Sequence, residues 1–159
     1  MKERKFNHHA MEHGMIDPTN ELTPQPDMDL VNNLSTPHND VKIWFKAARV
    51  EAFPENGGAC VKYKDLQIAV FNFSRRNEWY ACQNMCPHKM QMALSRGMIG
   101  SHNNEPKVAC PFHKKTFSLK TGECLNAEEC NITVYPVRIE NDYVHIGFTS
   151  EDPNGASCL

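Results

Sequence analysis

Short apolar or alternating runs, separated by turn residues every eight to twelve positions, follow one another from Val41 to about residue 148. This spacing is typical of all-β sandwiches and barrels. The sequence therefore predicts an all-β fold of antiparallel strands with low helix content. The expected strands cover residues 42–50, 60–63, 67–73, 79–83, 108–110, 116–119, 133–139 and 143–148.

Turn residues mark several of the connections between these strands. Lys64-Asp65 joins two runs closely, the polar residues 74–78 can reverse the chain, and residues 140–142 close a last hairpin. Gly122 suits a left-handed turn position because it has no side chain. Pro136 lies inside an expected strand, which predicts an edge strand or a bulge there.

Residues 1–40 differ from the rest of the chain. They hold three Lys or Arg against seven Asp or Glu, a local net charge of -4, and four prolines without apolar periodicity. Such a composition predicts a flexible acidic tail. We expect three parts: this tail, one domain over 41–150, and a short C-terminal tail over 151–159.

Composition narrows the class of protein. The chain has 159 residues, 40% of them hydrophobic, a net charge of -2 and a pI near 6.4, which argue for one packed domain and against nucleic-acid binding. There is no apolar run of membrane-spanning length and no secretory signal. We therefore expect a cytosolic protein without a membrane or nucleic-acid partner. Its seven cysteines indicate a metal site rather than disulfides.

Two short segments carry the candidate ligands. They are Cys86-Pro87-His88 and Cys110-Pro111-Phe112-His113, with 21 residues between them. Each follows a run of strand type and offers one thiolate and one imidazole. The proline after each cysteine stiffens its loop because the ring fixes φ.

Two kinds of metal centre use such a ligand set. Zinc accepts two cysteines and two histidines, but zinc fingers usually take a cysteine pair from one segment and a histidine pair from the other. In a Rieske [2Fe–2S] centre, two cysteines hold one iron and two histidines hold the other. The spacing favours the iron–sulfur centre, and zinc remains the alternative.

The ligand choice affects the reduction potential. Two ferric ions, two sulfides, two thiolates and two neutral imidazoles sum to zero charge, whereas a four-cysteine cluster carries -2. An electron is added more easily to the neutral centre, so Rieske potentials of about -150 to +300 mV exceed the about -400 mV of plant-type ferredoxins.

Residues 41–148 resemble a Rieske [2Fe–2S] domain, whose pattern assigns Cys86 and Cys110 to one iron and His88 and His113 to the other. The segments 79–89, 94–97 and 108–125, including Leu94-Ser-Arg-Gly97, resemble the small subunit of assimilatory NAD(P)H-dependent nitrite reductases. The resemblance implies an antiparallel β-sandwich with a small cluster-binding subdomain. It also implies a subunit that relays electrons or supports its complex in nitrate assimilation.

The resemblance also implies where the potential lies. High-potential Rieske proteins have a further cysteine in each cluster loop, and a serine and a tyrosine that donate hydrogen bonds to the sulfurs. This chain has Phe112, Lys115 and Phe117 at the corresponding second-loop positions. Because fewer donors stabilise the reduced centre less, we expect a low-potential, ferredoxin-like centre.

By the same resemblance, the partner is a large subunit that holds FAD, sirohaem and a [4Fe–4S] cluster and binds nitrite. The present chain has no catalytic residue of its own in this interpretation. It lacks a glycine-rich dinucleotide motif, so direct NAD(P)H binding is not expected. The alternatives are a stand-alone Rieske ferredoxin that serves an aromatic-ring dioxygenase, and a zinc-stabilised interaction module.

Further residues carry weaker expectations. The segment 86–120 has six basic residues and one acid, Glu105, which could steer an acidic partner. Methionines near the ligands are expected to form an apolar surround that excludes water. They are Met85, Met90, Met92 and Met98. The four non-ligand cysteines before the C-terminal tail are expected to be buried thiols of the core. They are Cys60, Cys82, Cys124 and Cys130.

Overall fold

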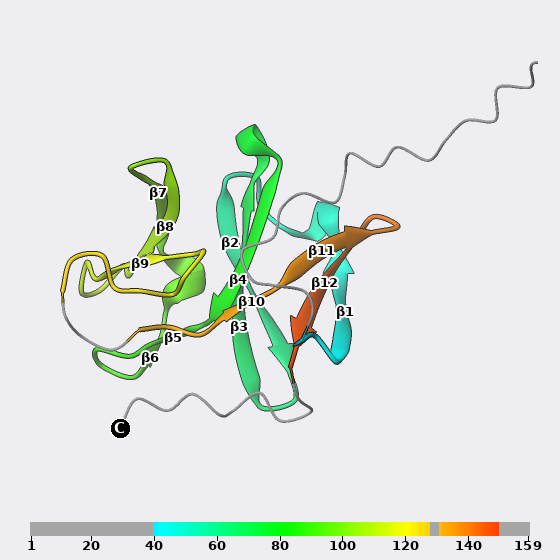
Figure 1. The fold of residues 1–159 in the computed structure, drawn as a ribbon, viewed down its shortest axis with the longest axis horizontal. Coiled ribbons are helices and arrows are strands. Elements are labelled where there is room, and N and C mark those ends of the chain that lie inside the picture. The colour runs from blue at the N-terminus through cyan, green and yellow to red at the C-terminus, as the bar shows by residue number, and fades with distance from the viewer. Residues whose placement is uncertain (1–39, 128–130, 150–159) are drawn as a thin grey trace, which may run out of the picture.

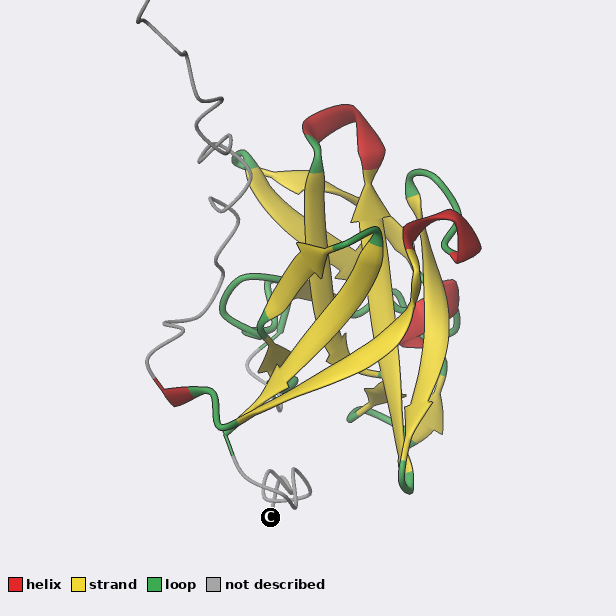
Figure 2. Ribbon diagram, turned by 90° about the vertical axis from the view of Figure 1, so that its right-hand side faces the viewer, coloured by secondary structure: helices red, strands yellow, loops and turns green. Residues whose placement is uncertain are grey.

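The computed structural model describes residues 40–127 and 131–149. Within this part, strands dominate and the named helical elements are three-residue 3-10 turns (Figure 2). The all-β prediction with low helix content is therefore confirmed. The strands are β1 (Ile43–Arg49), β2 (Gly57–Tyr63), β3 (Leu66–Phe73), β4 (Glu78–Gln83), β5 (Met85–Cys86), β6 (Gln91–Met92), β7 (Met98–His102), β8 (Glu105–Ala109), β9 (Thr116–Ser118), β10 (Val134–Tyr135), β11 (Val137–Glu140) and β12 (Tyr143–Phe148).

Two antiparallel sheets form the sandwich on one side of the molecule (Figure 1). One has the strand order β1-β12-β11 and the other β10-β4-β3-β2. Between them lies an apolar core that includes Ile68, Val70, Trp79, Ile146 and Phe148. Burial of these side chains holds the two sheets together.

The four-stranded sheet is buried on both faces at its centre. Strand β3 is buried from Ile68 to Phe73 without interruption. Ile68 and Val70 face the sandwich core, whereas Phe71 and Phe73 belong to a second core. This alternation follows from the two-residue period of a strand.

The second core supports a smaller subdomain, made of the hairpin β5-β6 and the sheet β7-β8-β9. Leu94, Val108, Phe117 and Leu119 of this subdomain are fully or almost fully buried. Figure 1 shows the subdomain at the end of the molecule away from β1, β11 and β12. The expected combination of a β-sandwich and a cluster-binding subdomain is thus present.

The predicted turns are found where polar residues adopt left-handed backbone conformations. Lys64 has φ of 52°, Asn141 of 50° and Asp142 of 62°, as tight hairpins between twisted strands require. Gly122 has φ of 82°. At this position a Cβ atom would come within 2.1 Å of the Ile132 carbonyl oxygen, so the turn needs glycine.

Pro136 interrupts the predicted strand 133–139. Strand β10 before it pairs with β4, whereas β11 after it pairs with β12 in the opposite sheet. Its carbonyl still accepts a hydrogen bond from Gly147, with N···O of 2.8 Å. Proline cannot donate to a ladder, and here it marks the point where the chain changes sheets.

The sequence patterns did not predict β5, β6 and β7. Strands β5 and β6 have two residues each, too few for a pattern, and β7 has no buried residue. The expected tails over 1–40 and 151–159 lie outside the described residues, apart from Asp40. No helix among the described residues is long and apolar enough to cross a membrane.

Candidate metal centre

Two β-hairpins carry the four predicted ligands. In the first, Cys86 ends β5 and pairs with Gln91 of β6, so that His88 lies in the connecting turn. In the second, Cys110 follows β8 and the chain returns at Thr116 of β9, with His113 between them. Each ligand pair is therefore held by a strand end and a short reversal.

The side chains of the two hairpins meet. The Sγ atoms of Cys86 and Cys110 and a ring nitrogen of His113 lie within 4.8 Å of one another. Cys110 Sγ is 3.8 Å from His113 Nδ1. The ring centroids of His88 and His113 are 4.8 Å apart, with their planes at 62°. Thus the structure brings all four predicted residues to one place.

The ligands differ in burial. Cys86 and Cys110 are buried, His113 is half-buried and His88 is exposed. Burial raises the pKa of the Cys86 thiol to about 11, while the backbone N–H of His88 lowers it in part and the neighbouring Cys110 raises it further. A metal held here would bind the thiolate, so its binding would have to remove this proton.

Asn84 fastens the first hairpin. Its backbone carbonyl accepts hydrogen bonds from Ala93 (2.9 Å) and Leu94 (3.0 Å), and its Oδ1 accepts one from the Ser95 N–H at 2.8 Å. Its Nδ2 donates to Gln67 Oε1 at 2.9 Å. Asn84 is only 2% exposed, so these bonds are made away from water. They tie both ends of the hairpin to β3.

The second hairpin is closed by backbone bonds and by Asn126. The Cys110 N–H donates to the Lys115 carbonyl at 2.8 Å, and the Lys114 N–H to the Cys110 carbonyl at 3.0 Å. Asn126 Nδ2 donates to the Lys114 carbonyl at 2.9 Å, and its Oδ1 accepts from the Thr116 N–H at 3.0 Å. Sequence reasoning missed Asn84 and Asn126, because an isolated asparagine carries no recognisable spacing.

Among the described residues, the remaining cysteines are not part of this group. Cys82 is buried as predicted, and burial raises the pKa of its thiol far above the ordinary value. Cys124 is half-buried, and Cys130 lies outside the described residues. The prediction was wrong for Cys60, which is exposed. Strand β2 is the outermost of its sheet, and its alternate residues Ala59 and Val61 pack on the sandwich core, so Cys60 faces away from that core.

The expectation of an apolar methionine surround was also wrong for three residues. Met90, Met92 and Met98 are exposed, and only Met85 is half-buried. The reason is their position: Met90 lies in the turn of the first hairpin, Met92 on its second strand and Met98 at the start of the edge strand β7. Trp79 is buried in the sandwich core.

The donor set fits an iron–sulfur centre. The two thiols are buried, one imidazole is half-buried and the other is exposed. A Rieske centre takes two cysteines on one iron and two histidines on the other, which is the set present here. The family model of the Rieske-like [2Fe-2S] domain matches residues 43–147. The chain belongs to this family. A Rieske-type [2Fe–2S] cluster is therefore its cofactor.

Relatives of this Rieske-like chain have nitrite reductase names. It is 40% identical over 93 residues to "Nitrite reductase [NAD(P)H]" of Emericella nidulans. This match covers 56% of the present chain and 8% of the Emericella protein. It is 28% identical over 103 residues to "Nitrite reductase (NADH) small subunit" of Escherichia coli K12. This match covers 65% of the present chain and 95% of the Escherichia coli protein. The chain thus spans a small part of the fungal protein and nearly all of the bacterial subunit.

A solved structure shows the same likeness. The NMR structure of the E. coli protein NirD superposes with a TM-score of 0.62 and 28% sequence identity, over 68% of this chain and 98% of that one. The likeness covers most of the described part of the Rieske-like chain. The fold of this chain is therefore shared with NirD.

Proposed function

We propose that this chain is the Rieske small subunit of an NAD(P)H-dependent nitrite reductase, an oxidoreductase that reduces nitrite to ammonium in nitrate assimilation. The main support is the complete set of two cysteines and two histidines on adjoining hairpins. The relatives that match the same region and are named nitrite reductases add to it. The nitrite reductase names of these relatives favour this function over a dioxygenase ferredoxin.

Within the proposal, Cys86 and Cys110 hold the inner iron and His88 and His113 the outer iron. The cluster supplies a carrier for one electron at a time. The buried thiolates keep the sulfur side away from water, and the exposed His88 brings the other side to the surface. Of the four residues that would hold the cluster, His88 is the exposed one, and it would face a docking partner.

The partner in this proposal is a large subunit that holds FAD, sirohaem and a [4Fe–4S] cluster and binds nitrite. Reduction of nitrite to ammonium takes six electrons, which three NAD(P)H molecules supply as hydrides. The present chain contributes no substrate-binding residue. It either relays electrons or supports the complex, and we place it in the cytosol with its partner.

The test is anaerobic purification of the chain from cells grown on nitrite. Co-purification of a large protein with sirohaem absorption, and nitrite-dependent oxidation of NAD(P)H by the complex, is the expected result. A brown chain recovered without any partner would favour the free ferredoxin. A colourless chain that contains zinc and no iron would contradict the cluster altogether.

A double variant separates relay from support. C86A/C110A removes both inner ligands and leaves the surface histidines in place. If the variant still co-purifies but nitrite-dependent NAD(P)H oxidation is lost, the chain relays electrons. If the complex keeps its activity without the cluster, the chain has a supporting role.

A further inference from the structure

Large apolar side chains are exposed around the metal centre. The described residues expose five of them, and four flank the ligands: Met90 at 67%, Met92 at 52%, Met98 at 75% and Phe112 at 65%. Only Ile139, on β11 of the sandwich, lies elsewhere. A concentration of exposed apolar residues at one end of a protein typically marks an interaction surface.

Met90 and Phe112 lie in the two turns that carry the candidate ligands. Met90 is two residues after His88, and the Phe112 ring lies 6.3 Å from the His113 ring, measured between centroids. Met92 is paired with Met85 beside Cys86, and Met98 is paired with Ala109 beside Cys110. Successive residues of a strand point to opposite faces, so Met92 and Met98 have their side chains on the other face of these strands from the two cysteines. Met90 and Phe112 are therefore the exposed apolar residues that lie in the ligand turns.

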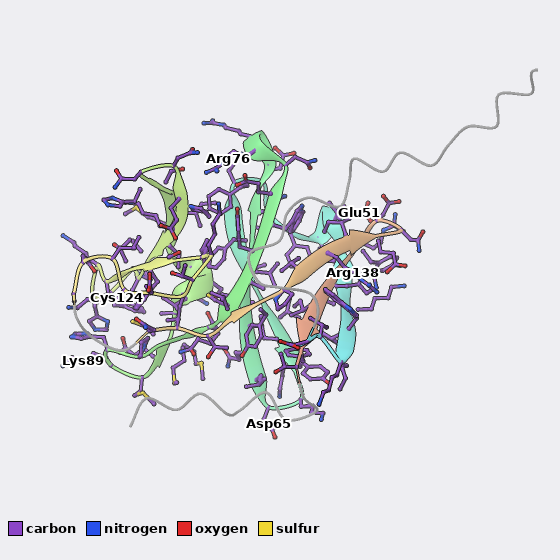
Figure 3. All side chains as sticks on the ribbon, in the orientation of Figure 1. Glu51, Asp65, Arg76, Lys89, Cys124 and Arg138 are labelled. Carbon is purple, nitrogen blue, oxygen red and sulfur yellow. The ribbon has the colours of Figure 1, made fainter. Side chains whose placement is uncertain are left out.

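Basic residues accompany the apolar ones. Lys89 and Lys114 are exposed in the turns of the two hairpins, and Figure 3 shows Lys89 at the outer end of the subdomain. Among residues 86–120, Glu105 is the only acid, and its carboxylate accepts a hydrogen bond from the Ser118 hydroxyl. Exposed lysines therefore stand beside exposed apolar residues in the two turns that carry the candidate ligands.

We propose that this cluster face, made of Lys89, Met90, Phe112 and Lys114, docks on a redox protein whose surface has an apolar patch ringed by carboxylates. The inference rests on the proposed function, which makes the large nitrite reductase subunit that partner. Phe112 is the central anchor, because exposed aromatic side chains contribute most to such interfaces. The lysines steer the encounter and set its orientation.

The relatives give a separate reason to expect such a surface. In the Emericella nidulans protein, the matching region is 8% of a single longer chain. There, the peptide chain itself joins the Rieske-like region to the rest of the protein. In the Escherichia coli relative, by contrast, the match covers 95% of a protein that is itself named a small subunit, so its contact with a large subunit is non-covalent. Docking through the cluster face also brings the exposed His88 next to the partner.

The experiment measures binding of the cluster-loaded full chain to the large subunit purified from the same cells. The apolar test variant is M90S/F112S, and its matched control is I139S, which removes the exposed apolar residue on the sandwich. The charge test variant is K89E/K114E, with K62E on β2 as control. The absorption and EPR spectra of each variant show whether the fold and cluster are retained.

We expect M90S/F112S to raise the dissociation constant about tenfold or more while I139S leaves it unchanged. We expect K89E/K114E to weaken binding and to reduce its dependence on salt, which K62E does not do. If the wild-type chain binds the large subunit and both test variants bind it equally well, the proposed docking face is wrong. The proposed function would still stand. Absence of binding by the wild-type chain would count against the proposed function itself.

Two other occupants of the face give distinct results. If the wild-type chain alone forms a dimer that M90S/F112S converts to a monomer, the face is a contact between copies, and the proposal is wrong. The acidic segment 1–39 is the other candidate. If removal of segment 1–39 tightens partner binding tenfold, and if K89E/K114E abolishes that gain, the chain's own acidic segment competes with the partner for the cluster face. The cluster face is then not free for the partner in the full chain.

Discussion

At the scale of single residues, the metal centre depends on side chains that bind no metal. Asn84 is buried and has its backbone carbonyl, Oδ1 and Nδ2 all hydrogen-bonded. Ser95 and Gln67, which it joins, belong to different elements, so Asn84 fixes the first hairpin against the sheet. A buried polar group left without a hydrogen-bond partner lowers the free energy of unfolding by more than the hydrogen bond itself contributes.

We predict that Asn84→Ala lowers the free energy of unfolding by about 2–3 kcal/mol and speeds loss of the cluster, because the Ser95 N–H is left without an acceptor. Urea unfolding and the decay of visible absorption measure the two effects. Gln91→Ala, an exposed residue of the same hairpin, is the control and should change stability by less than about 0.5 kcal/mol. Equal behaviour of the two variants would contradict the role of Asn84.

A second residue-scale prediction concerns the outer ligands. His113→Cys replaces a neutral imidazole by a thiolate and makes the centre more negative by one charge. Its midpoint potential should fall toward the about -400 mV of four-cysteine clusters. Protein-film voltammetry measures the change, and the exposed His102→Cys is the control. A potential equal to that of the wild-type chain would count against ligation by His113.

At the scale of elements, the segment between the hairpins sets their separation. The 3-10 turn η5 (Leu94–Arg96) has Leu94 and Ser95 buried, and Gly97 then leads into β7. A Cβ atom on Gly97 would come within 2.6 Å of the Ala109 carbonyl oxygen and of Val108 Cγ2. Ala109 precedes the ligand Cys110. The close passage at Gly97 therefore holds the second hairpin near the first, which explains the Leu-Ser-Arg-Gly motif.

We predict that Gly97→Ala destabilises the protein by about 1–3 kcal/mol, because a backbone oxygen must move to admit the methyl group. Iron and sulfide content should fall in parallel, since the displaced strand carries Cys110. Gly100→Ala on the following strand β7 is the matched control, because its new Cβ atom would meet only Lys107 Cε at 3.8 Å. If Gly97→Ala retains the cluster as well as Gly100→Ala does, the spacing argument is wrong.

At the scale of the whole molecule, the central sheet links two apolar cores. Tyr135 of β10 lies in the sandwich core and Tyr80 of β4 in the core below the subdomain. Burial raises the pKa of Tyr135 to about 12, with a smaller contribution from Cys82, and burial also raises the pKa of Tyr80. The folded state thus favours the neutral phenols on both faces of the sheet.

The sign of the pH effect follows from these shifts. A tyrosine in the unfolded chain ionises near pH 10, whereas the buried tyrosines ionise only at higher pH. Between these values, loss of the phenol proton stabilises the unfolded chain relative to the folded one. We predict that the stability present below about pH 10 is lost as the pH rises toward 12. Urea unfolding at increasing pH measures the loss, and Tyr135→Phe should flatten the profile. Parallel profiles for the two proteins would show that Tyr135 does not contribute.

Much of the fold and the ligand set could be predicted because both depend on local patterns. Alternating apolar residues, the turn at Lys64-Asp65 and Gly122 act over a few residues. The pairs Cys86–His88 and Cys110–His113 have a spacing that short loops can present to one centre. Strands of two residues, such as β5, are too short to produce any pattern.

The sequence by itself determined the strand-rich architecture and the four candidate ligands. Only the tertiary structure decided that Asn84 and Asn126 fasten the hairpins, that Cys60 is exposed, and that Met90, Met92 and Met98 face outward. Burial and long-range hydrogen bonds depend on which elements pack together, whereas turn type and ligand spacing depend on neighbours in the chain. The cluster face could therefore be recognised only after the two hairpins had been placed side by side.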